Sequence, residues 1–401
     1  MSANWEFRLS TPIRFGGGML SKLSQTVAPW GRRIFWVGYR TPVGLETVYE
    51  KVRQQLSIAG LAVQEFLEVD AEPDVPLVNR GAEAARAFGA EVVLGVGGGS
   101  VLDTAKAIAA LARMGGPLAD YLPLPTPARR IDQALPILAV PTTAGTGSEV
   151  TSLAVFHWQD PAQPDIRMKL TLAAEVLVPK VALVDPELMA SCPVELTARC
   201  AADALAHAME ASMSRRASPL VHLLAEEAIG QILGYLPAAL ARPEDRQARE
   251  ALALSATMAG MALQQAGATL GHAMAHALGA LAGVPHGLAV AQVTPAALRY
   301  NMTECSDLLA RWSRRLALPG RNPLELAEAF LAQTEQLFQK ANLLERIVLP
   351  GPAEVDWPGR LAQNAFQSTP IPLKLNPRKI DEPTLAELFR EILKEQCNTL
   401  V

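Results

Sequence analysis

Along its first 185 residues the chain alternates short, apolar, β-rich runs with segments whose apolar residues repeat at helical spacing. Strand–helix alternation of this kind predicts a doubly wound, mostly parallel sheet. The strand candidates are continuous apolar runs, as expected where helices cover both faces of a sheet. The expected strands are Ile34–Gly38, Ala62–Leu67, Val92–Gly95, Pro136–Val140 and Val181–Val184. The helices expected between them are Val43–Ala59, Pro76–Phe88 and Val101–Arg113.

The pattern changes after Asp185 and Pro186. From Pro193 onward almost no β-rich run occurs, and helix-forming Ala, Leu, Glu and Gln dominate. We therefore predict an α/β domain over residues 1–185, an all-helical domain over residues 186–401, and a cleft between them. The helices expected in the second domain are Val194–Met213, Pro219–Leu236, Asp245–Gln265, Leu270–Leu281, Pro323–Leu337 and Pro383–Lys394.

Composition excludes several classes of protein. Half of the 401 residues are hydrophobic and 19% are charged, which is enough apolar material for two cores or one large one. This balance argues against disorder, a collagen-like fibre or a coiled coil. The net charge is near −4 and no segment forms a basic stripe, which argues against a nucleic-acid partner.

The cysteines and the N-terminal sequence favour the cytoplasm. Widely spaced cysteines without a C-x-x-C pair argue against a disulfide framework or a structural zinc knuckle. The N-terminal residues include Glu6, Arg8 and Arg14 and have no apolar core, so we expect no signal peptide. The cysteines are Cys192, Cys200, Cys305 and Cys397.

A segment of 48 residues between Glu250 and Arg299 has no charged side chain. Its length alone would allow two membrane spans. It also contains Gln264, Gln265, three histidines, six glycines and Pro285, which a lipid-exposed helix tolerates poorly. We expect these residues to form the interior of the helical domain, and we expect no membrane association.

A glycine-rich turn follows the apolar run that ends near residue 96. Gly97, Gly98, Gly99 and Ser100 stand between that expected strand and the next expected helix. Glycines let a backbone approach a ligand closely, and the helix N-terminus beyond offers unpaired N–H groups to an anion. The turn therefore predicts a pyrophosphate site, although Ser100 stands where the G-x-G-x-x-G fingerprint has its last glycine. A plain strand-to-helix turn is the alternative.

A second polar loop follows the expected strand that ends at Val140. It contains Thr142, Thr143 and Thr146 together with two glycines and Ser148. The carboxyl ends of strands in open α/β sheets are where ligands bind. An ordinary polar loop explains this composition equally well.

Histidines and one acid carry the strongest signal. Asp203 and His207 are four residues apart on an expected helix, so both lie on one face. His272 and His276 repeat this spacing, and His286 follows a break at residues 283–285 where the chain can fold back. Three imidazoles and a carboxylate suit a borderline divalent ion such as Fe²⁺ or Zn²⁺.

The alternative is that each histidine is a hydrogen-bonded core residue. Three histidines within fifteen residues of an uncharged segment are harder to explain in this way, because each buried imidazole needs a polar partner and one metal serves several. His157 and His222 belong to neither cluster, so we interpret both as structural.

At these residues the chain resembles the iron-containing (group III) alcohol dehydrogenase family. The matching segments occur in family order and span nearly the whole chain. They are GGGSVLD at residues 97–103, PTTAGTGSE at 141–149, DALAHAME at 203–210, HAMAHALGA at 272–280 and VPHG at 284–287.

The resemblance implies a role for each candidate residue. Asp203, His207, His272 and His286 would hold a divalent metal, typically Fe²⁺, and His276 would lie beside it near the nicotinamide. Residues 97–100 would bind the pyrophosphate, with Thr142, Thr143 and Thr146 along the nucleotide. Lys169 matches a cofactor-contacting lysine more loosely, and a solvated surface lysine is the alternative.

One departure from the family concerns the choice of cofactor. Members that prefer NAD tend to have an aspartate after the first strand, where this chain has Tyr39 and Arg40. Because an aspartate would repel a 2′-phosphate and Arg40 could pair with one, the sequence favours NADP over NAD. The alternative is that Tyr39 stacks or points outward while Arg40 lies in solvent.

The sequence thus predicts a metal-dependent oxidoreductase that transfers a hydride between a primary alcohol, or its aldehyde, and NAD(P). We expect the metal to act as a Lewis acid and His276 to relay the released proton. Alternatives are a glycerol-dehydrogenase-like or dehydroquinate-synthase-like enzyme, a hydroxyacid–oxoacid transhydrogenase, and a non-catalytic nucleotide-binding protein. The resemblance suggests a homodimer or larger oligomer, and it leaves open the particular alcohol and the choice of Fe²⁺ or Zn²⁺.

Overall fold

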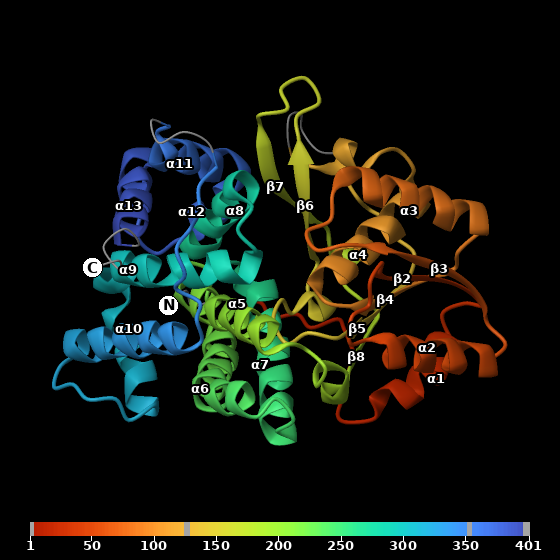
Figure 1. The fold of residues 1–401 in the computed structure, drawn as a ribbon, viewed down its shortest axis with the longest axis horizontal. Coiled ribbons are helices and arrows are strands. Elements are labelled where there is room, and N and C mark those ends of the chain that lie inside the picture. The colour runs from red at the N-terminus through yellow and green to blue at the C-terminus, as the bar shows by residue number, and fades with distance from the viewer. Residues whose placement is uncertain (1–3, 124–128, 351–354, 396–401) are drawn as a thin grey trace.

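The computed structural model describes residues 4–123, 129–350 and 355–395. It confirms a parallel-sheet domain followed by a helical domain. In Figure 1 the parallel sheet and the helices that cover it lie to the right, and the helices of the C-terminal part lie to the left. The exact division at residue 185 stays a prediction, although the last strand of the sheet ends at Val184 and the first long helix of the second part begins at Val194.

Six strands of the described chain form one parallel sheet, in the order β1-β8-β5-β4-β2-β3. Their bounds are β1 (Ile13–Phe15), β2 (Arg33–Tyr39), β3 (Ala62–Val69), β4 (Val92–Gly97), β5 (Ile137–Pro141) and β8 (Val181–Val184). The helices beside them are α1 (Leu23–Val27), α2 (Glu46–Ile58), α3 (Val75–Phe88) and α4 (Gly99–Met114).

Helices cover both faces of this sheet, as the continuous apolar runs predicted. Ile34 and Trp36 of β2 pack with α1 and α2, whereas Phe35 and Val37 pack with α3 and α4 on the opposite face. All four side chains are fully buried. Because strand side chains alternate between faces, only a strand covered on both sides can be apolar at consecutive positions.

A β-hairpin that the sequence analysis did not expect lies between the two parts. Its strands are β6 (Leu153–Gln159) and β7 (Arg167–Ala173), which pair antiparallel and outside the main sheet. Burial alternates along β6, so a period of two was present in the sequence. In Figure 1 the hairpin rises beside α8 and α4, and β7 contacts α8 while β6 contacts α4.

The second part is helical throughout the residues described after residue 193. Its helices are α5 (Val194–Met213), α6 (Pro219–Ala241), α7 (Arg246–Ala266), α8 (Leu270–Ala282), α9 (His286–Arg315), α10 (Pro323–Lys340), α11 (Trp357–Ser368), α12 (Pro370–Leu375) and α13 (Glu382–Glu395). The expected bounds of α5 are confirmed exactly. The long helix α9 was not expected, because Pro295 lies inside it and prolines usually end helices.

No helix among the described residues is long and apolar enough to cross a membrane. The uncharged segment instead forms α7, α8 and the first half of α9, whose side chains make up much of the helical core. Cys192, Cys200 and Cys305 are free thiols. Cys397 lies outside the described residues.

The two parts come into close backbone contact at a pair of glycines. Gly147 follows β5 with φ of +63°, and it lies against Gly260 of α7. A Cβ at position 260 would lie 2.7 Å from the Gly147 Cα and 2.8 Å from its carbonyl oxygen. Both neighbouring atoms belong to the backbone and cannot rotate away. This contact therefore limits how near α7 comes to the loop after β5.

Replacing Gly260 by Ala is expected to destabilise the protein by about 1–3 kcal/mol, because the added methyl group overpacks this contact. Gly234 of α6 is a matched control, since a Cβ there meets nothing within 4 Å. Gly234→Ala should be neutral, or stabilising by up to about 1 kcal/mol through helix propensity. Denaturant unfolding of both variants measures the difference, and equal stabilities would contradict the account of this contact.

Candidate active site

The predicted metal ligands come together from three helices. Asp203 and His207 lie one turn apart on α5, His272 lies in the first turn of α8, and His286 is the first residue of α9. The Oδ1 atom of Asp203 lies 3.7 Å from Nε2 of His207, 3.4 Å from Nε2 of His272 and 3.4 Å from Nε2 of His286. Ligand atoms of Asp203, His207 and His272 all lie within 4.8 Å of one another.

The turn between α8 and α9 places His286 at this cluster. Helix α8 ends at Gly283, which adopts φ of +66°, and Pro285 directly precedes α9. Gly287 then lets α9 begin against α5, because a Cβ there would lie 2.4 Å from the carbonyl oxygen of Arg199. Arg199 is one turn before Asp203 on α5. The close backbone contact between Gly287 and Arg199 therefore brings the side chains of His286 and Asp203 together.

The cluster fits a divalent cation. The Oδ1 atom of Asp203 and the Nε2 atom of His272 are buried, and neither has a hydrogen-bond partner among the described residues. Buried polar atoms without partners are rare and call for a bound group. Imidazole nitrogens with one carboxylate oxygen are the donor set that Fe²⁺ and Zn²⁺ accept.

Electrostatics at the cluster also favour a cation. Burial lowers the pKa of His207 to about 4, which leaves this imidazole neutral with a lone pair for a ligand. Burial opposes the charge of Asp203 as well, but the neighbouring His207 and His286 outweigh it and lower the pKa of this carboxyl. Burial opposes the charge of His272 too, but the carboxylates of Glu210 and Asp203 outweigh it and raise the pKa of this imidazole to about 10, so a cation would have to displace its proton. The site therefore combines a carboxylate that stays ionised with at least one neutral imidazole, His207.

Glu210 is a site residue that the sequence analysis did not identify. Its Oε1 atom lies 2.7 Å from Nδ1 of His272, and its Oε2 atom accepts hydrogen bonds from the backbone N–H and hydroxyl of Thr269. These contacts orient His272 so that Nε2 faces Asp203. Asp203, His207 and Glu210 follow i, i+4, i+7 spacing on α5, so the helix period could have revealed Glu210.

His276 lies beside the cluster, as the resemblance implied. Its ring centroid is 5.7 Å from that of His286, and its side chain is buried. Burial lowers its pKa, and its Nδ1 atom has no hydrogen-bond partner in the described structure. Burial therefore favours the neutral form of His276, and its Nδ1 atom faces no hydrogen-bonding group of the described chain.

The two polar loops predicted to bind the cofactor lie against each other. A Cβ at Gly98 would lie 2.7 Å from the Tyr39 hydroxyl and 3.0 Å from Oγ1 of Thr143, and a Cβ at Gly99 would lie 2.5 Å from Cγ2 of Thr146. Helix α4 begins at Gly99 without a side-chain cap. The loops thus form a cradle at the carboxyl ends of β4 and β5, where an anion would meet the helix N-terminus.

The other residues of these loops differ in exposure. The Thr142 side chain is buried, and its backbone N–H donates to the carbonyl oxygen of Gly97. Ser100 and Thr146 are partly exposed. A contact between Thr142 and the cofactor therefore stays a prediction. The burial of the Thr142 side chain does not favour this contact.

Tyr39 and Arg40 end β2 beside the cradle. The Tyr39 hydroxyl accepts a hydrogen bond of 3.2 Å from the backbone N–H of Gly98. Arg40 forms an ion pair of 3.2 Å with Asp70, and both side chains are more than half exposed. The Asp70 carboxylate therefore lies near the end of β2, where the sequence itself has no aspartate. Asp70 belongs to the segment after β3.

Lys169 is buried and not a surface lysine. It lies on β7 with a side-chain exposure of 4%, and its ammonium forms an ion pair of 2.8 Å with Glu72. A Cβ at Gly279 of α8 would lie 2.5 Å from Nζ of Lys169. Gly279 is three residues after His276 on α8, so the ammonium lies close to His276, which is beside the predicted metal ligands.

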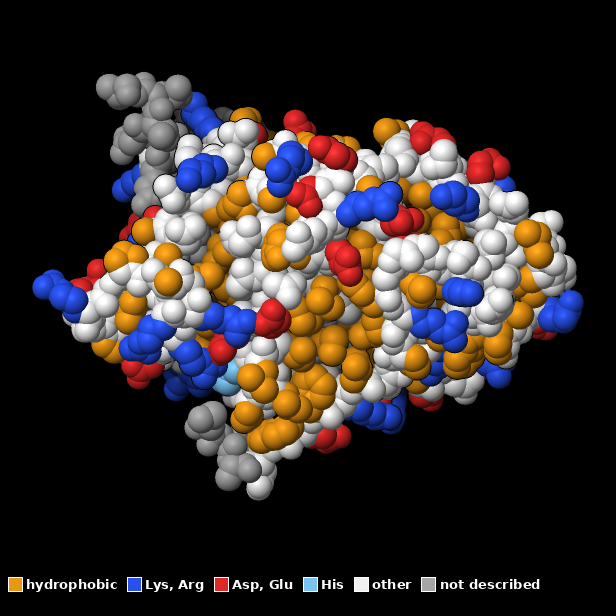
Figure 2. All heavy atoms as spheres, turned by 90° about the horizontal axis from the view of Figure 1, so that it is seen from below, with side chains coloured by type: hydrophobic (Ala, Val, Ile, Leu, Met, Phe, Trp, Pro, Cys, Tyr) orange, Lys and Arg blue, Asp and Glu red, His pale blue; other side chains and the backbone are white. Residues whose placement is uncertain are grey.

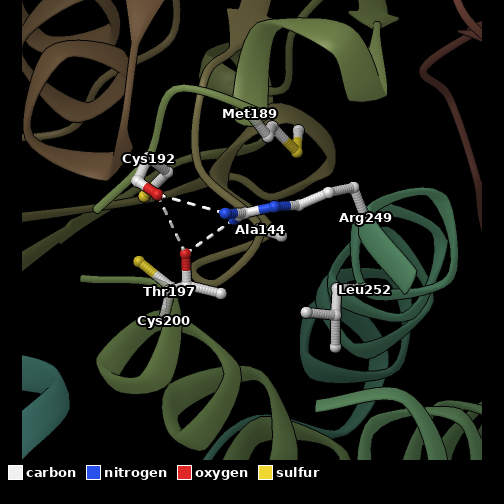
Figure 3. A pocket seen from close by; sticks show the side chains of 7 residues that line it. All are labelled: Ala144, Met189, Cys192, Thr197, Cys200, Arg249 and Leu252. Atoms are coloured by element: carbon white, nitrogen blue, oxygen red, sulfur yellow. Dashed lines mark hydrogen bonds between the residues drawn. The ribbon is translucent and has the colours of Figure 1, made fainter. Parts of the chain in front are cut away.

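A separate pocket lies behind the cradle, where α5 and α7 approach the loop after β5 (Figure 3). The Arg249 side chain crosses it and donates to Oγ1 of Thr197 at 2.6 Å and to the carbonyl oxygen of Cys192 at 3.2 Å. None of the predicted metal ligands lines this pocket. Burial raises the pKa of the Cys192 and Cys200 thiols, so this pocket holds a structural contact and no activated nucleophile.

Glycine- and threonine-rich loops at the carboxyl ends of a parallel sheet, together with a buried carboxylate–imidazole cluster on helices, are the features expected of a metal-dependent dehydrogenase. Comparison with known families agrees with this class. The model of the iron-containing alcohol dehydrogenases matches residues 10–186, and the model of their C-terminal domain matches residues 197–393. The chain belongs to the iron-containing alcohol dehydrogenase family, and it is an alcohol dehydrogenase.

Individual relatives support this assignment. The chain is 33% identical to 1-propanol dehydrogenase PduQ of Salmonella typhimurium over 97% of this chain and 99% of that protein. It is 32% identical to the NAD-dependent methanol dehydrogenase of Bacillus methanolicus over 86% of this chain and 88% of that protein. The solved structure of a 1,3-propanediol oxidoreductase superposes with a TM-score of 0.87 at 29% identity, covering 97% of this chain and 100% of that one. Membership implies NAD(P) and a divalent metal, typically iron.

Glu210→Gln is expected to weaken metal binding about ten- to a hundredfold, because residues that orient a metal-bound histidine contribute this much. Metal titration of the purified, metal-depleted variant measures the change. Glu227→Gln is the control, since Glu227 forms an ion pair with Arg315 and is 42% exposed. Equal metal affinity in both variants would show that Glu210 does not orient His272.

Proposed function

We propose that this alcohol dehydrogenase transfers a hydride between a primary alcohol, or its aldehyde, and NAD(P), with Asp203, His207, His272 and His286 as its metal ligands. The convergence of three Nε2 atoms within 3.7 Å of a single buried carboxylate oxygen carries the proposal. We propose Fe²⁺ as the resident metal, because the family is named for iron, with Zn²⁺ as the alternative that the same ligands accept.

In the proposed reaction, the metal and the nicotinamide would supply part of the chemistry, and the protein's own residues would supply the rest. The metal would supply a Lewis acid for the alcohol oxygen, and the nicotinamide would supply the hydride acceptor. The protein would hold both groups in place and exclude water from the buried ligands. His276 would relay the proton released by the alcohol, because its buried side chain lies beside the ligand cluster and its Nδ1 atom has no hydrogen-bond partner in the described chain.

The proposed cofactor site follows from the cradle. Gly97, Gly98, Gly99 and Ser100 bind the pyrophosphate at the N-terminus of α4. The other contacts proposed are Tyr39, Thr142, Thr143, Thr146 and Lys169. Lys169 lies on the metal side of the cradle, where its ammonium can donate hydrogen bonds near the nicotinamide end.

Location and assembly are proposals of the same kind. We propose a cytoplasmic enzyme, which suits the free thiols of Cys192, Cys200 and Cys305. We propose a homodimer or a larger homo-oligomer, and Figure 2 shows hydrophobic side chains gathered on one face of the molecule. Exposed leucines on α6 and α7, such as Leu223 and Leu254, would suit an interface.

His272→Ala is expected to abolish metal retention and turnover while leaving cofactor binding measurable, because His272 belongs to the ligand set and not to the cradle. Elemental analysis, alcohol oxidation and cofactor fluorescence measure the three properties. His222→Ala is the control, since His222 of α6 bonds Ser212. A His272→Ala variant with full metal and normal activity would disprove the proposed site.

We propose a preference for NADP, because Arg40 lies at the end of β2 and is held by an exposed ion pair worth at most about 1 kcal/mol and by one hydrogen bond of 3.3 Å to the carbonyl oxygen of Glu68. A 2′-phosphate can replace the Asp70 carboxylate at this guanidinium. Arg40→Ala should raise KM for NADPH about tenfold or more and leave KM for NADH within about twofold. Arg80→Ala, which removes another exposed ion pair, is the control. An unchanged ratio of the two KM values would refute the preference.

A further inference from the structure

Glu72 has an unusual backbone conformation close to the cradle. It follows β3 and adopts φ of +59°, which favours glycine and costs other residues roughly 1–2 kcal/mol. Such a residue persists where its surroundings determine its conformation, often at a functional site. The contacts of Glu72 show what holds it there.

Three contacts link Glu72 to three different elements. Its backbone N–H donates to Oγ of Ser100, at the start of α4, over 3.2 Å. Its Oε1 atom accepts a hydrogen bond of 2.8 Å from the Lys169 ammonium on β7. Its Oε2 atom lies 2.7 Å from Nε2 of His157 on β6. Glu72 thereby joins the pyrophosphate loop to both strands of the hairpin.

His157 is more than the isolated structural residue that the sequence suggested. It is the cross-strand partner of Lys169 in the hairpin, so both side chains reach Glu72 from one face. The backbone N–H of His157 also donates to the carbonyl oxygen of Pro73, directly after Glu72. The hairpin is therefore attached to this segment by its backbone as well as by its side chains.

The buried ammonium of Lys169 needs the carboxylate of Glu72 to balance its charge. Burial lowers the pKa of Lys169, because an ammonium out of water is unfavourable, and the adjacent Glu72 opposes this effect. Burial also raises the pKa of Glu72, but the hydrogen bond with His157 and the charge of Lys169 outweigh it and lower this pKa to about 2. Glu72 therefore stays ionised at neutral pH, and its charge favours the charged form of Lys169. An unbalanced ammonium would repel a divalent cation in the same cleft.

We propose that Glu72 is a positioning residue of the dehydrogenase, which fixes the Lys169 ammonium between the pyrophosphate loop and the metal ligands, while His157 fixes Glu72. The inference rests on the proposed function, in which Lys169 contacts the cofactor. Glu72 acts through Lys169, and its strained backbone lets one residue reach Ser100, Lys169 and His157 together.

A double-mutant cycle tests this inference, because coupled residues give non-additive effects. The variants are Glu72→Gln, Lys169→Gln and the double substitution, with kcat, KM for the cofactor and bound metal measured for each. Glu72→Gln should lower kcat/KM about tenfold or more, and it should change kcat/KM less than about twofold when Lys169 is already Gln. Bound metal should equal that of the unsubstituted enzyme.

Two outcomes would overturn the inference. An equal loss from Glu72→Gln in both backgrounds would mean that Glu72 does not act through Lys169. Full activity of Lys169→Gln would show that Lys169 has no role in turnover. The metal bound by this variant and its normal turnover would still agree with the proposed metal site. Glu68→Gln is the matched control, because Glu68 also lies at the end of β3 and forms only an exposed ion pair with Arg80.

Glu72→Gly separates the positioning role from a structural one. Glycine adopts φ of +59° without strain, so the thermal unfolding midpoint should be no lower than that of Glu72→Gln, which loses the same charge and keeps the strain. The kcat/KM value should fall as far as in Glu72→Gln. A stable Glu72→Gly enzyme with unchanged kcat/KM would refute the proposal.

Discussion

The carboxylate of Asp203 is the constraint on which the helical domain depends. It is buried in α5 among imidazoles from α5, α8 and α9, and its Oδ1 atom has no hydrogen-bond partner in the described chain. A buried charge without a partner is strongly destabilising, so the surrounding helices have to present groups that stabilise it. Glycines at the start of α9 and small residues along α5 allow the close approach that this requires. Packing in this domain and cation binding therefore depend on each other.

Much of this arrangement was predictable from local sequence. Helical period placed Asp203 and His207 on one face of α5, and the glycine and proline before His286 indicated where the chain turns back. The same period would have identified Glu210. The ion pair between Lys169 and Glu72 was not predictable in this way, because the two residues are 97 positions apart. Only the docking of the hairpin brings them together, and local patterns contain no signal for such a contact.

The lack of a local signal for long-range contacts also explains other differences between the sequence analysis and the structure. Tyr39 and Arg40 were interpreted from their place after β2, whereas Asp70, which pairs with Arg40, follows the neighbouring strand β3. Parallel strands bring their carboxyl ends to one edge of a sheet, so a residue missing after one strand can be supplied from the next. Helix α9 was not among the expected helices, and it continues through Pro295 inside the packed core. Tertiary packing outweighed local propensity there.

Contacts between the sheet part and the helical part fix the distance between the cradle on the sheet and the cluster of predicted metal ligands on the helices. Gly147 and Gly260 bring the loop after β5 against α7, and Thr257 of α7 donates a hydrogen bond of 2.8 Å to buried Glu149 in the same loop. The hairpin supplies a further connection from the opposite side, since β6 contacts α4 and β7 contacts α8. Hydride transfer requires reacting atoms within about 3–3.5 Å of each other, so small changes in this separation would lower the rate steeply. Under the proposed function, a hairpin outside the main sheet, attached through Glu72 to the glycine-rich loop at the start of α4, belongs to the catalytic geometry even though it contributes no predicted metal ligand.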